Sequence, residues 1–291
     1  MNQLNIIECL DSEDLVLENR ASLGLNPRDA ALLGQGALKA IQDGFYTLQD
    51  GTRVDWGEAV KGCRSLARSF PPDAPLPAIP PCDLPGATRV QVVNQTTLVA
   101  AQRMHRSGRR PLALNFANGL QPGGGFLTGA RAQEEVLCRS SALYTTLDGD
   151  KMYSAHKGRP HPDSTDWAIL SPRVPVFRTD AGITVPWWPL DVITCAAPFA
   201  PAIGRDRASE LLRVRIHRVL AIAAAHDYDS LVLGAWGCGA FGNEPFRTAF
   251  DFREALEGPF AGRFSEVTFA ITDWSPERRF LGPFRDTFEE S

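Results

Sequence analysis

Two hydrophobic periodicities alternate along the last two thirds of the chain. Short apolar runs of strand length occupy 88–94, 111–118, 167–178, 190–199, 230–237 and 265–273. Segments with apolar residues at helical spacing lie between or after them, at 96–108, 133–147, 207–226, 244–258 and 278–288. Apolar strands that alternate with amphipathic helices predict an α/β fold, with a mixed, mostly parallel sheet sandwiched between helices.

The first part of the chain has a different pattern. Residues 26–45 have helical spacing, with Asn26 and Pro27 as the N-cap and first helical residue. Residues 45–56 predict a hairpin that turns at Asp-Gly. The proline-rich stretch 71–86 cannot continue a helix or join a central strand. We therefore expect a mainly helical accessory region at 1–86, ending in this connector, and the main domain at 87–291. The alternative for the connector is a surface loop inside one domain.

Composition excludes several classes of protein. The chain has 291 residues, of which 44% are hydrophobic and 22% charged, as in ordinary soluble domains. A net charge of −4 gives no reason to expect nucleic-acid binding. No apolar run reaches the length of a membrane span, and the acidic N-terminus does not resemble a signal peptide. The six scattered cysteines include no CxxC pair, which favours reduced thiols in a cytoplasmic protein over a zinc site or disulfide scaffold.

Two glycine-rich loops follow predicted strands, where α/β proteins bind ligands. The first contains Gly123, Gly124 and Gly125, without the Gly-Lys-Ser/Thr of a nucleotide P-loop. The second has the pattern G-x-G-x-x-G at residues 237–242. Glycine lets backbone N–H groups approach an anion closely. We expect the second loop to bind a diphosphate, and a tight loop without a ligand is the alternative.

A pair of carboxylates begins the helix after the first loop. Glu134 and Glu135 taken alone are typical of solvated charges on a first helical turn. Adjacent helical residues point about 100° apart, so one carboxylate can face a ligand while the other holds a hydroxyl or supports the loop. Asn118, at the preceding strand end, is a further polar candidate, with an Asx-turn as its alternative role.

The two loops together resemble one enzyme family. The segment NFANGLQPGGGFLTGARAQEE, residues 115–135, resembles the signature of poly(ADP-ribose) glycohydrolases, and GAWGCGAFGNEP, residues 234–245, is similar to their diphosphate loop. The resemblance covers most of the chain and is closest to bacterial-type members. It implies a macrodomain-like fold with an ADP-ribose cleft. It also implies hydrolysis of the ribose–ribose O-glycosidic bond of poly(ADP-ribose) from the chain end, with release of ADP-ribose.

The resemblance also implies residue roles. Glu135 is expected to be the general acid and base, and Glu134 to bind ribose hydroxyls. A carboxyl group donates near neutral pH only when burial or a neighbouring charge raises its pKa, and Glu134 is such a neighbour. The expected substrate-binding residues are Asn118, Gly123, Gly124, Gly125, Gln133, Gly237, Cys238, Gly239, Ala240, Phe241 and Gly242, with Asn94 and Thr97 on the adenine side.

Several further expectations complete the hypothesis. No cofactor or metal is expected, because the five histidines are dispersed. The expected partners are poly(ADP-ribose), the product ADP-ribose and poly-ADP-ribosylated proteins, with no direct DNA or membrane binding and a monomeric state. The alternative functions are a mono-ADP-ribosyl hydrolase, a non-catalytic ADP-ribose reader and, from the glycine pattern, an NAD-dependent dehydrogenase.

Two segments and two arginines each have two possible interpretations. Residues 195–199 form a cleft wall or pack in the core. Residues 186–192, PWWPLDV, form an aromatic lid or an apolar loop. The side chains of Arg131 and Arg139 either contact substrate phosphates or are solvent-exposed charges on a helix. The second interpretation is favoured.

Overall fold

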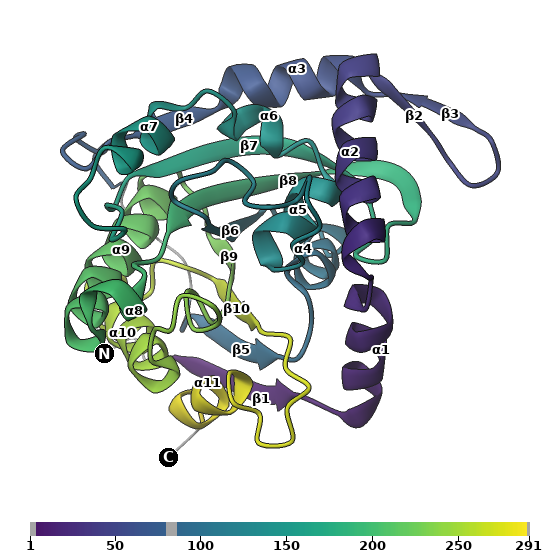
Figure 1. The fold of residues 1–291 in the computed structure, drawn as a ribbon. Helices are drawn as coiled ribbons and strands as arrows, with labels where there is room; N and C mark the ends of the chain where they lie inside the picture. Colours follow the sequence, from purple (N-terminus) through teal and green to yellow (C-terminus); the bar gives the residue numbers. More distant parts are fainter. Residues whose placement is uncertain (1–3, 80–85, 290–291) are drawn as a thin grey trace.

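An eight-stranded mixed sheet forms the centre of the molecule (Figure 1). The computed structural model describes residues 4–79 and 86–289. The strand order is β1-β5-β10-β9-β6-β8-β7-β4, in which only β8–β7 and β7–β4 pair antiparallel. The predicted mostly parallel sheet is thus confirmed. The strands are β1 (Asn5–Leu10), β4 (Arg68–Phe70), β5 (Arg89–Val93), β6 (Pro111–Ala117), β7 (Ala168–Arg178), β8 (Thr184–Ala196), β9 (Ser230–Leu233) and β10 (Glu266–Ala270).

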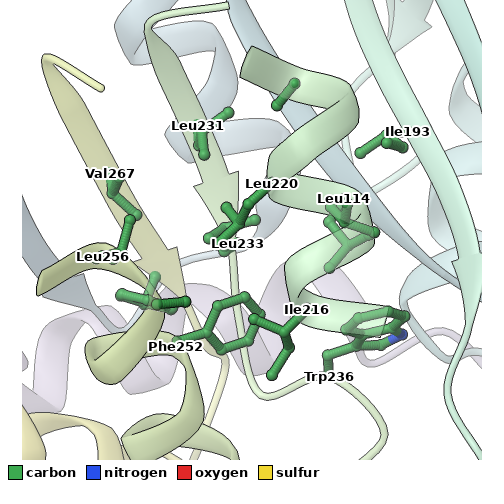
Figure 2. Close-up of a cluster of buried hydrophobic side chains, with 14 of the residues drawn as sticks. Leu114, Ile193, Ile216, Leu220, Leu231, Leu233, Trp236, Phe252, Leu256 and Val267 are labelled. Atoms are coloured by element: carbon green, nitrogen blue, oxygen red, sulfur yellow. The ribbon is translucent and has the colours of Figure 1, made fainter. Parts of the chain in front are cut away.

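Helices cover both faces of this sheet, as the alternating pattern predicts. One group consists of α8 (Ala200–Ile203), α9 (Arg205–Ala225), α10 (Pro245–Glu257) and α11 (Leu281–Thr287). In Figure 2, Ile216 and Leu220 of α9 and Phe252 of α10 lie against Leu231 and Leu233 of β9. Burial of each such side chain contributes about 2 kcal/mol to folding. The other group consists of α4 (Thr97–Arg106), α5 (Gln133–Ser140), α6 (Tyr144–Leu147) and α7 (Lys151–Lys157).

The segment before residue 87 contributes to the same sheet. Its strands β1 and β4 form the two edges, next to β5 and β7. Its other elements are α1 (Glu13–Leu23), α2 (Pro27–Asp43), β2 (Phe45–Thr47), β3 (Arg53–Asp55) and α3 (Gly57–Leu66). The predicted Asn26 cap and the β2–β3 hairpin are confirmed. Residues 80–85 of the predicted connector lie outside the described part of the chain, and the boundary at residue 86 stays a prediction.

The structure corrects two local predictions. Residues 133–147 form two helices, because Ser141 is extended, bridges to Val176, and uses its hydroxyl to bond the Leu137 carbonyl at 2.7 Å. Residues 186–192 are neither a lid nor a loop, since they lie within strand β8. Their pairing with β7 is a long-range interaction that local proline content does not reveal.

Candidate active site

Two adjacent parallel strands bring the glycine loops together. β6 pairs with β9, so the loop after β6 and the loop after β9 emerge at the same edge of the sheet. A cavity of about 590 Å³ lies there, and its lining includes Thr97, Phe116, Gln133 and Gly239. Segments distant in sequence close its rim, among them Leu23 of α1. The fold therefore places Gly239 of the second loop and the start of α5, which follows the first loop, around one cavity. Gly123, Gly124, Gly125, Glu134 and Glu135 are not part of its lining.

Glu134 is held rigidly inside the first loop. Its side chain is only 3% exposed. Its Oε2 accepts a hydrogen bond from the Asn118 backbone N–H at 2.7 Å, and its Oε1 accepts one from the Asn115 side chain at 3.3 Å. Burial raises the pKa of Glu134 to about 8, the Asn118 N–H opposes this, and the charge of Glu135 adds to it. Glu134 is thus a fixed carboxyl group that takes a proton readily.

Glu135 has one oxygen bound and one oxygen free. Its Oε1 accepts a hydrogen bond from the Gly125 backbone N–H at 3.0 Å, whereas no donor among the described residues reaches Oε2. Gly124 makes this approach possible, because it has a φ of +57° and any Cβ there would collide with Oε1. The side chain is 7% exposed. A fixed carboxyl group with a free oxygen is suited to proton transfer.

Gln133 connects the start of α5 to the end of β6. Its Nε2 donates to the Leu114 carbonyl at 2.8 Å and to Thr97 Oγ1 at 3.1 Å, while its Oε1 accepts from the Phe116 N–H at 2.9 Å. Gln133 and Thr97 both line the cavity. The position of the two glutamates therefore depends on this amide, which fixes the first turn of their helix.

Asn118 combines the two roles that its position suggested. Its side-chain oxygen accepts from the N–H groups of Leu120 and Gln121 at 2.9 and 3.1 Å, which is the predicted Asx-turn. Its own backbone N–H holds Glu134. The side chain thus shapes the loop, while the main chain positions the carboxyl group.

The second loop has backbone N–H groups without a hydrogen-bond acceptor among the described residues. Gly242 N–H bonds the Gly239 carbonyl and Asn243 N–H bonds the Gly237 carbonyl, which closes the loop. In the described chain, the N–H groups of Gly239, Ala240 and Phe241 have no protein acceptor. A Cβ on Gly239 would meet nothing within 4 Å. Three consecutive free N–H groups beside a cavity form a site for an anion.

The side chains of this loop have distinct environments. Cys238 points inward, with Sγ 3.6 Å from Thr248 Oγ1, so only its backbone can face a ligand. Phe241 packs edge-on against Phe199, with ring centroids 5.7 Å apart. Of residues 195–199, Cys195, Ala196 and Ala197 are core residues. None of residues 195–199 is among the cavity-lining residues, so the structure supports core packing for this segment.

The dehydrogenase alternative does not fit the second loop. In a dinucleotide-binding fold the N-terminus of the following helix faces the pyrophosphate. Here the Glu244 carboxylate caps α10, accepting from the N–H groups of Phe246 and Arg247 at 3.1 and 2.6 Å. The first turn of α10 is thus already occupied by a protein carboxylate.

The prediction that Asn94 contacts adenine is corrected. Asn94 is fully buried. Its Nδ2 donates to Asp11 Oδ1 and to the Asp273 carbonyl, and its Oδ1 accepts from Asn19 and from the Asp273 N–H. Both hydrogens and both lone pairs are used, so the side chain joins distant segments and has nothing left for a ligand. Trp274 and Phe280, which no sequence motif singles out, line the cavity.

The two arginines of the first loop and helix differ. Arg131 is exposed and donates to the Leu25 carbonyl at 2.7 Å. Arg139 is only 1% exposed, so the solvated-charge interpretation is wrong for it. Burial of this side chain follows from the packing of α5 against α2 and β7, which the local sequence does not reveal.

Other residues support the site without a strong sequence signal. Asn243 Nδ2 ties the second loop together by donating to the carbonyls of Pro198 and Gly237 at 2.9 and 3.1 Å. His156 Nδ1 bonds the carbonyl of Gly119, next to Asn118, at 3.0 Å. In the part of the chain that the structure describes, no three potential metal-ligating side chains cluster, and no helix is long and apolar enough to span a bilayer. Asn243 lies within the second glycine-rich segment, residues 234–245, so the sequence alone could have indicated it. His156 lies outside both loops, and only the fold brings it to the site.

The sheet, the carboxylate-bearing loop and the anion-binding loop define a macrodomain-like glycoside hydrolase. The family model of the microbial-type PARG catalytic domain matches residues 34–179. The chain belongs to this family of poly(ADP-ribose) glycohydrolases.

Solved structures show the same relationship. The poly(ADP-ribose) glycohydrolase of Thermomonospora curvata is 37% identical over 89% of this chain and 99% of its own, with a TM-score of 0.84. Its structure bound to the inhibitor ADP-HPD gives a TM-score of 0.81 at the same identity and coverage. The enzyme of Deinococcus radiodurans in complex with ADP-ribose is 38% identical over 78% of this chain and 96% of its own, with a TM-score of 0.71. A search of curated protein sequences finds no match.

Proposed function

We propose that this protein hydrolyses the ribose–ribose O-glycosidic bonds of poly(ADP-ribose) and releases ADP-ribose, with Glu135 as general acid and base. The observation that carries the assignment is the free Oε2 of Glu135, whose carboxyl group is fixed by the Gly125 N–H on the same helical turn as the cavity-lining residues Gln133 and Val136. The three free amides of the second loop are suited to the diphosphate, and Phe241 to the adjoining ribose. The aromatic side chains of Trp274 and Phe280 suit the adenine ring.

The two carboxyl groups have different surroundings. N–H donors occupy both oxygens of Glu134, whereas only Oε1 of Glu135 has a donor among the described residues. Glu135 therefore has an oxygen available to supply the proton that the leaving group needs, and Glu134, when ionised, stabilises positive charge on the sugar.

The reaction proceeds through proton transfers by Glu135. Its carboxyl group donates a proton to the ribose oxygen that leaves, as the bond to the anomeric carbon breaks. The carboxylate then removes a proton from the water that attacks this carbon, which restores the acid. Leu23 and Gly24 of the N-terminal segment close one side of the cavity, which supports action at a chain end.

The remaining partners are part of the same proposal. The enzyme acts on polymer attached to poly-ADP-ribosylated proteins, as a monomer and without direct DNA binding. The cytoplasm is the proposed compartment, because the described cysteines, five in number, are all free thiols.

The test compares wild type with Glu135→Gln on purified poly(ADP-ribose), followed by chromatography of released ADP-ribose. We expect wild-type release and a loss of about 1000-fold in kcat for the variant, as for removal of a general acid. Calorimetry should give an ADP-ribose Kd within about threefold of wild type, since amide and carboxylate have the same shape. Glu58→Gln, at an exposed position of α3, is the matched control.

Two results would contradict the proposal, one for the catalytic residue and one for the reaction. Near wild-type turnover by Glu135→Gln would remove Glu135 as the acid. If wild type binds ADP-ribose without cleaving polymer, a mono-ADP-ribosylated protein substrate separates a mono-ADP-ribosyl hydrolase from a reader.

A further inference from the structure

A buried arginine lies one helical turn beyond the catalytic glutamate. Arg139 follows Glu135 by four residues on α5, so the two side chains leave the helix on the same face. Arg139 is 1% exposed, and among the described residues no protein atom accepts a hydrogen bond from any of its three guanidinium nitrogens. A buried cation without direct partners is unfavourable unless opposite charges lie nearby.

Two buried carboxyl groups lie near Arg139, and each supplies opposite charge when it is ionised. Burial raises the pKa of Asp180, and the Thr96 hydroxyl and the charge of Arg139 oppose this effect. Burial lowers the pKa of Arg139, and the charges of Asp180 and Glu135 oppose this effect. Asp180 follows β7 and lines the cavity, and its Oδ2 accepts from Thr96 Oγ1 at 2.7 Å. In the described chain its Oδ1 has no donor, as is true of Glu135 Oε2. Arg139 therefore lies in the field of two carboxyl groups without a direct ion pair to either.

One other partly buried cation lies near this helix: Arg178 of β7 donates to the Leu33 and Arg139 carbonyls at 2.7 and 3.0 Å, so its guanidinium is bound to main-chain oxygens. Glu134 is a carboxyl group, and Cys138 and Tyr153 stay neutral because burial raises the pKa of each well above its usual value. Arg131 is exposed, and solvent screens its charge. Arg139 is not suited to a direct phosphate contact either, because only 1% of it is exposed.

We propose that Arg139 is a positioning residue, which stabilises the negative charge that forms on Glu135 each time Glu135 donates its proton, and that Asp180 moderates this effect. The inference rests on the proposed function. The proton moves from Glu135 Oε2 to the leaving ribose oxygen and is replaced from the attacking water, so Glu135 alternates between neutral and anionic states. Arg139 favours the anionic state, while Asp180 limits the bias so that Glu135 still holds a proton before the bond breaks.

The test measures kcat against pH for wild type, Arg139→Met, Arg139→Lys and Asp180→Asn. Methionine fills similar space without charge, so we expect the basic limb, which reports loss of the acid's proton, to move up by about 1 pH unit. Asp180→Asn removes a negative charge, so the limb should move down. Arg139→Lys keeps the charge and should leave the limb near its wild-type position. ADP-ribose binding should stay within about threefold of wild type in the two Arg139 variants. Asp180 lines the cavity, so for Asp180→Asn only the position of the limb is compared.

The opposite signs separate this proposal from a purely structural role. If Arg139→Met and Asp180→Asn move the limb in the same direction, or lower kcat at every pH without moving it, the proposal is wrong. If Arg139→Met does not fold, the other two variants test the proposal. It then requires an unchanged basic limb for Arg139→Lys and a downward shift of that limb for Asp180→Asn. A wild type without turnover overturns the proposed function, and this inference with it, whereas an active wild type with unshifted variants overturns the inference alone.

Discussion

The two glycine loops look alike in sequence but direct their amides differently. In the first loop, the N–H groups of Asn118 and Gly125 bind the protein's own carboxylates, Glu134 and Glu135. In the second loop, three consecutive N–H groups have no acceptor within the described residues. The first loop is therefore a holder for catalytic groups, and the second is an open site for an anion.

The comparison teaches that a glycine has two distinct uses near a ligand. At Gly124 the missing Cβ makes room for a carboxylate of the same chain. At Gly239 it leaves open space at the cavity. Because catalysis depends on the placement of reacting groups more steeply than on uniform binding, substitutions in the two loops should affect different kinetic constants.

Among glycine substitutions in the two loops, the largest effect is expected from Gly124→Ala. The new Cβ would displace Glu135 Oε1 and would occupy a left-handed backbone conformation. We expect kcat on poly(ADP-ribose) to fall about 100-fold, because misplacement of a catalytic group by about 1 Å has that effect. Gly62→Ala, a helical position with open space, is the control for the same chemical change. Steady-state kinetics that show an unchanged kcat for Gly124→Ala would contradict the role of the first loop as a holder.

The next effect concerns the pH dependence of stability. Burial raises the pKa of Glu134 from 4.5 to about 8 in the folded protein. Between these values the folded state binds more protons than the unfolded state, so stability present at low pH is lost as pH rises toward 8. For one proton the slope is about 1.4 kcal/mol per pH unit. Glu134→Gln removes this titration and should flatten the profile in that window.

Urea denaturation at about pH 5 and at about pH 8, near the two ends of this pH range, measures the change in the free energy of unfolding. Glu58→Gln is again the control, because this glutamate is exposed and its pKa is lowered, chiefly by Lys61. If the unfolding free energy of Glu134→Gln fell with pH as steeply as that of wild type, burial would not raise the pKa of Glu134. The hydrogen bonds of the first loop would then compensate fully for the loss of water around its carboxylate.

The sequence predicts the site where local pattern determines geometry. The spacing from Gly124 to Glu135 and the order of strands and helices contain enough information to place both loops at one edge of the sheet. It does not predict contacts made by distant segments. Asn94 looks like a ligand group at a strand end, but its partners Asp11 and Asp273 lie near opposite ends of the chain. Arg139 has the spacing of a surface residue, and only the packing of α5 buries it.

The smallest effect tests the second loop. Gly239→Ala adds a methyl group that meets no protein atom, so neither folding nor kcat should change. Because the methyl group stands beside the free amides, we expect KM to rise about threefold, the size of a modest steric loss in uniform binding.

Gly237→Ala is the matched comparison within the same loop. This glycine has a φ of +76°, and a Cβ there would lie 2.6 Å from the Cβ of Ala197, so the variant should lose about 1–2 kcal/mol of stability. If Gly239→Ala instead lowered kcat with KM unchanged, the second loop would act on the transition state alone. The division between a loop that holds catalytic groups and a loop that binds substrate would then fail, because both would affect the same kinetic constant.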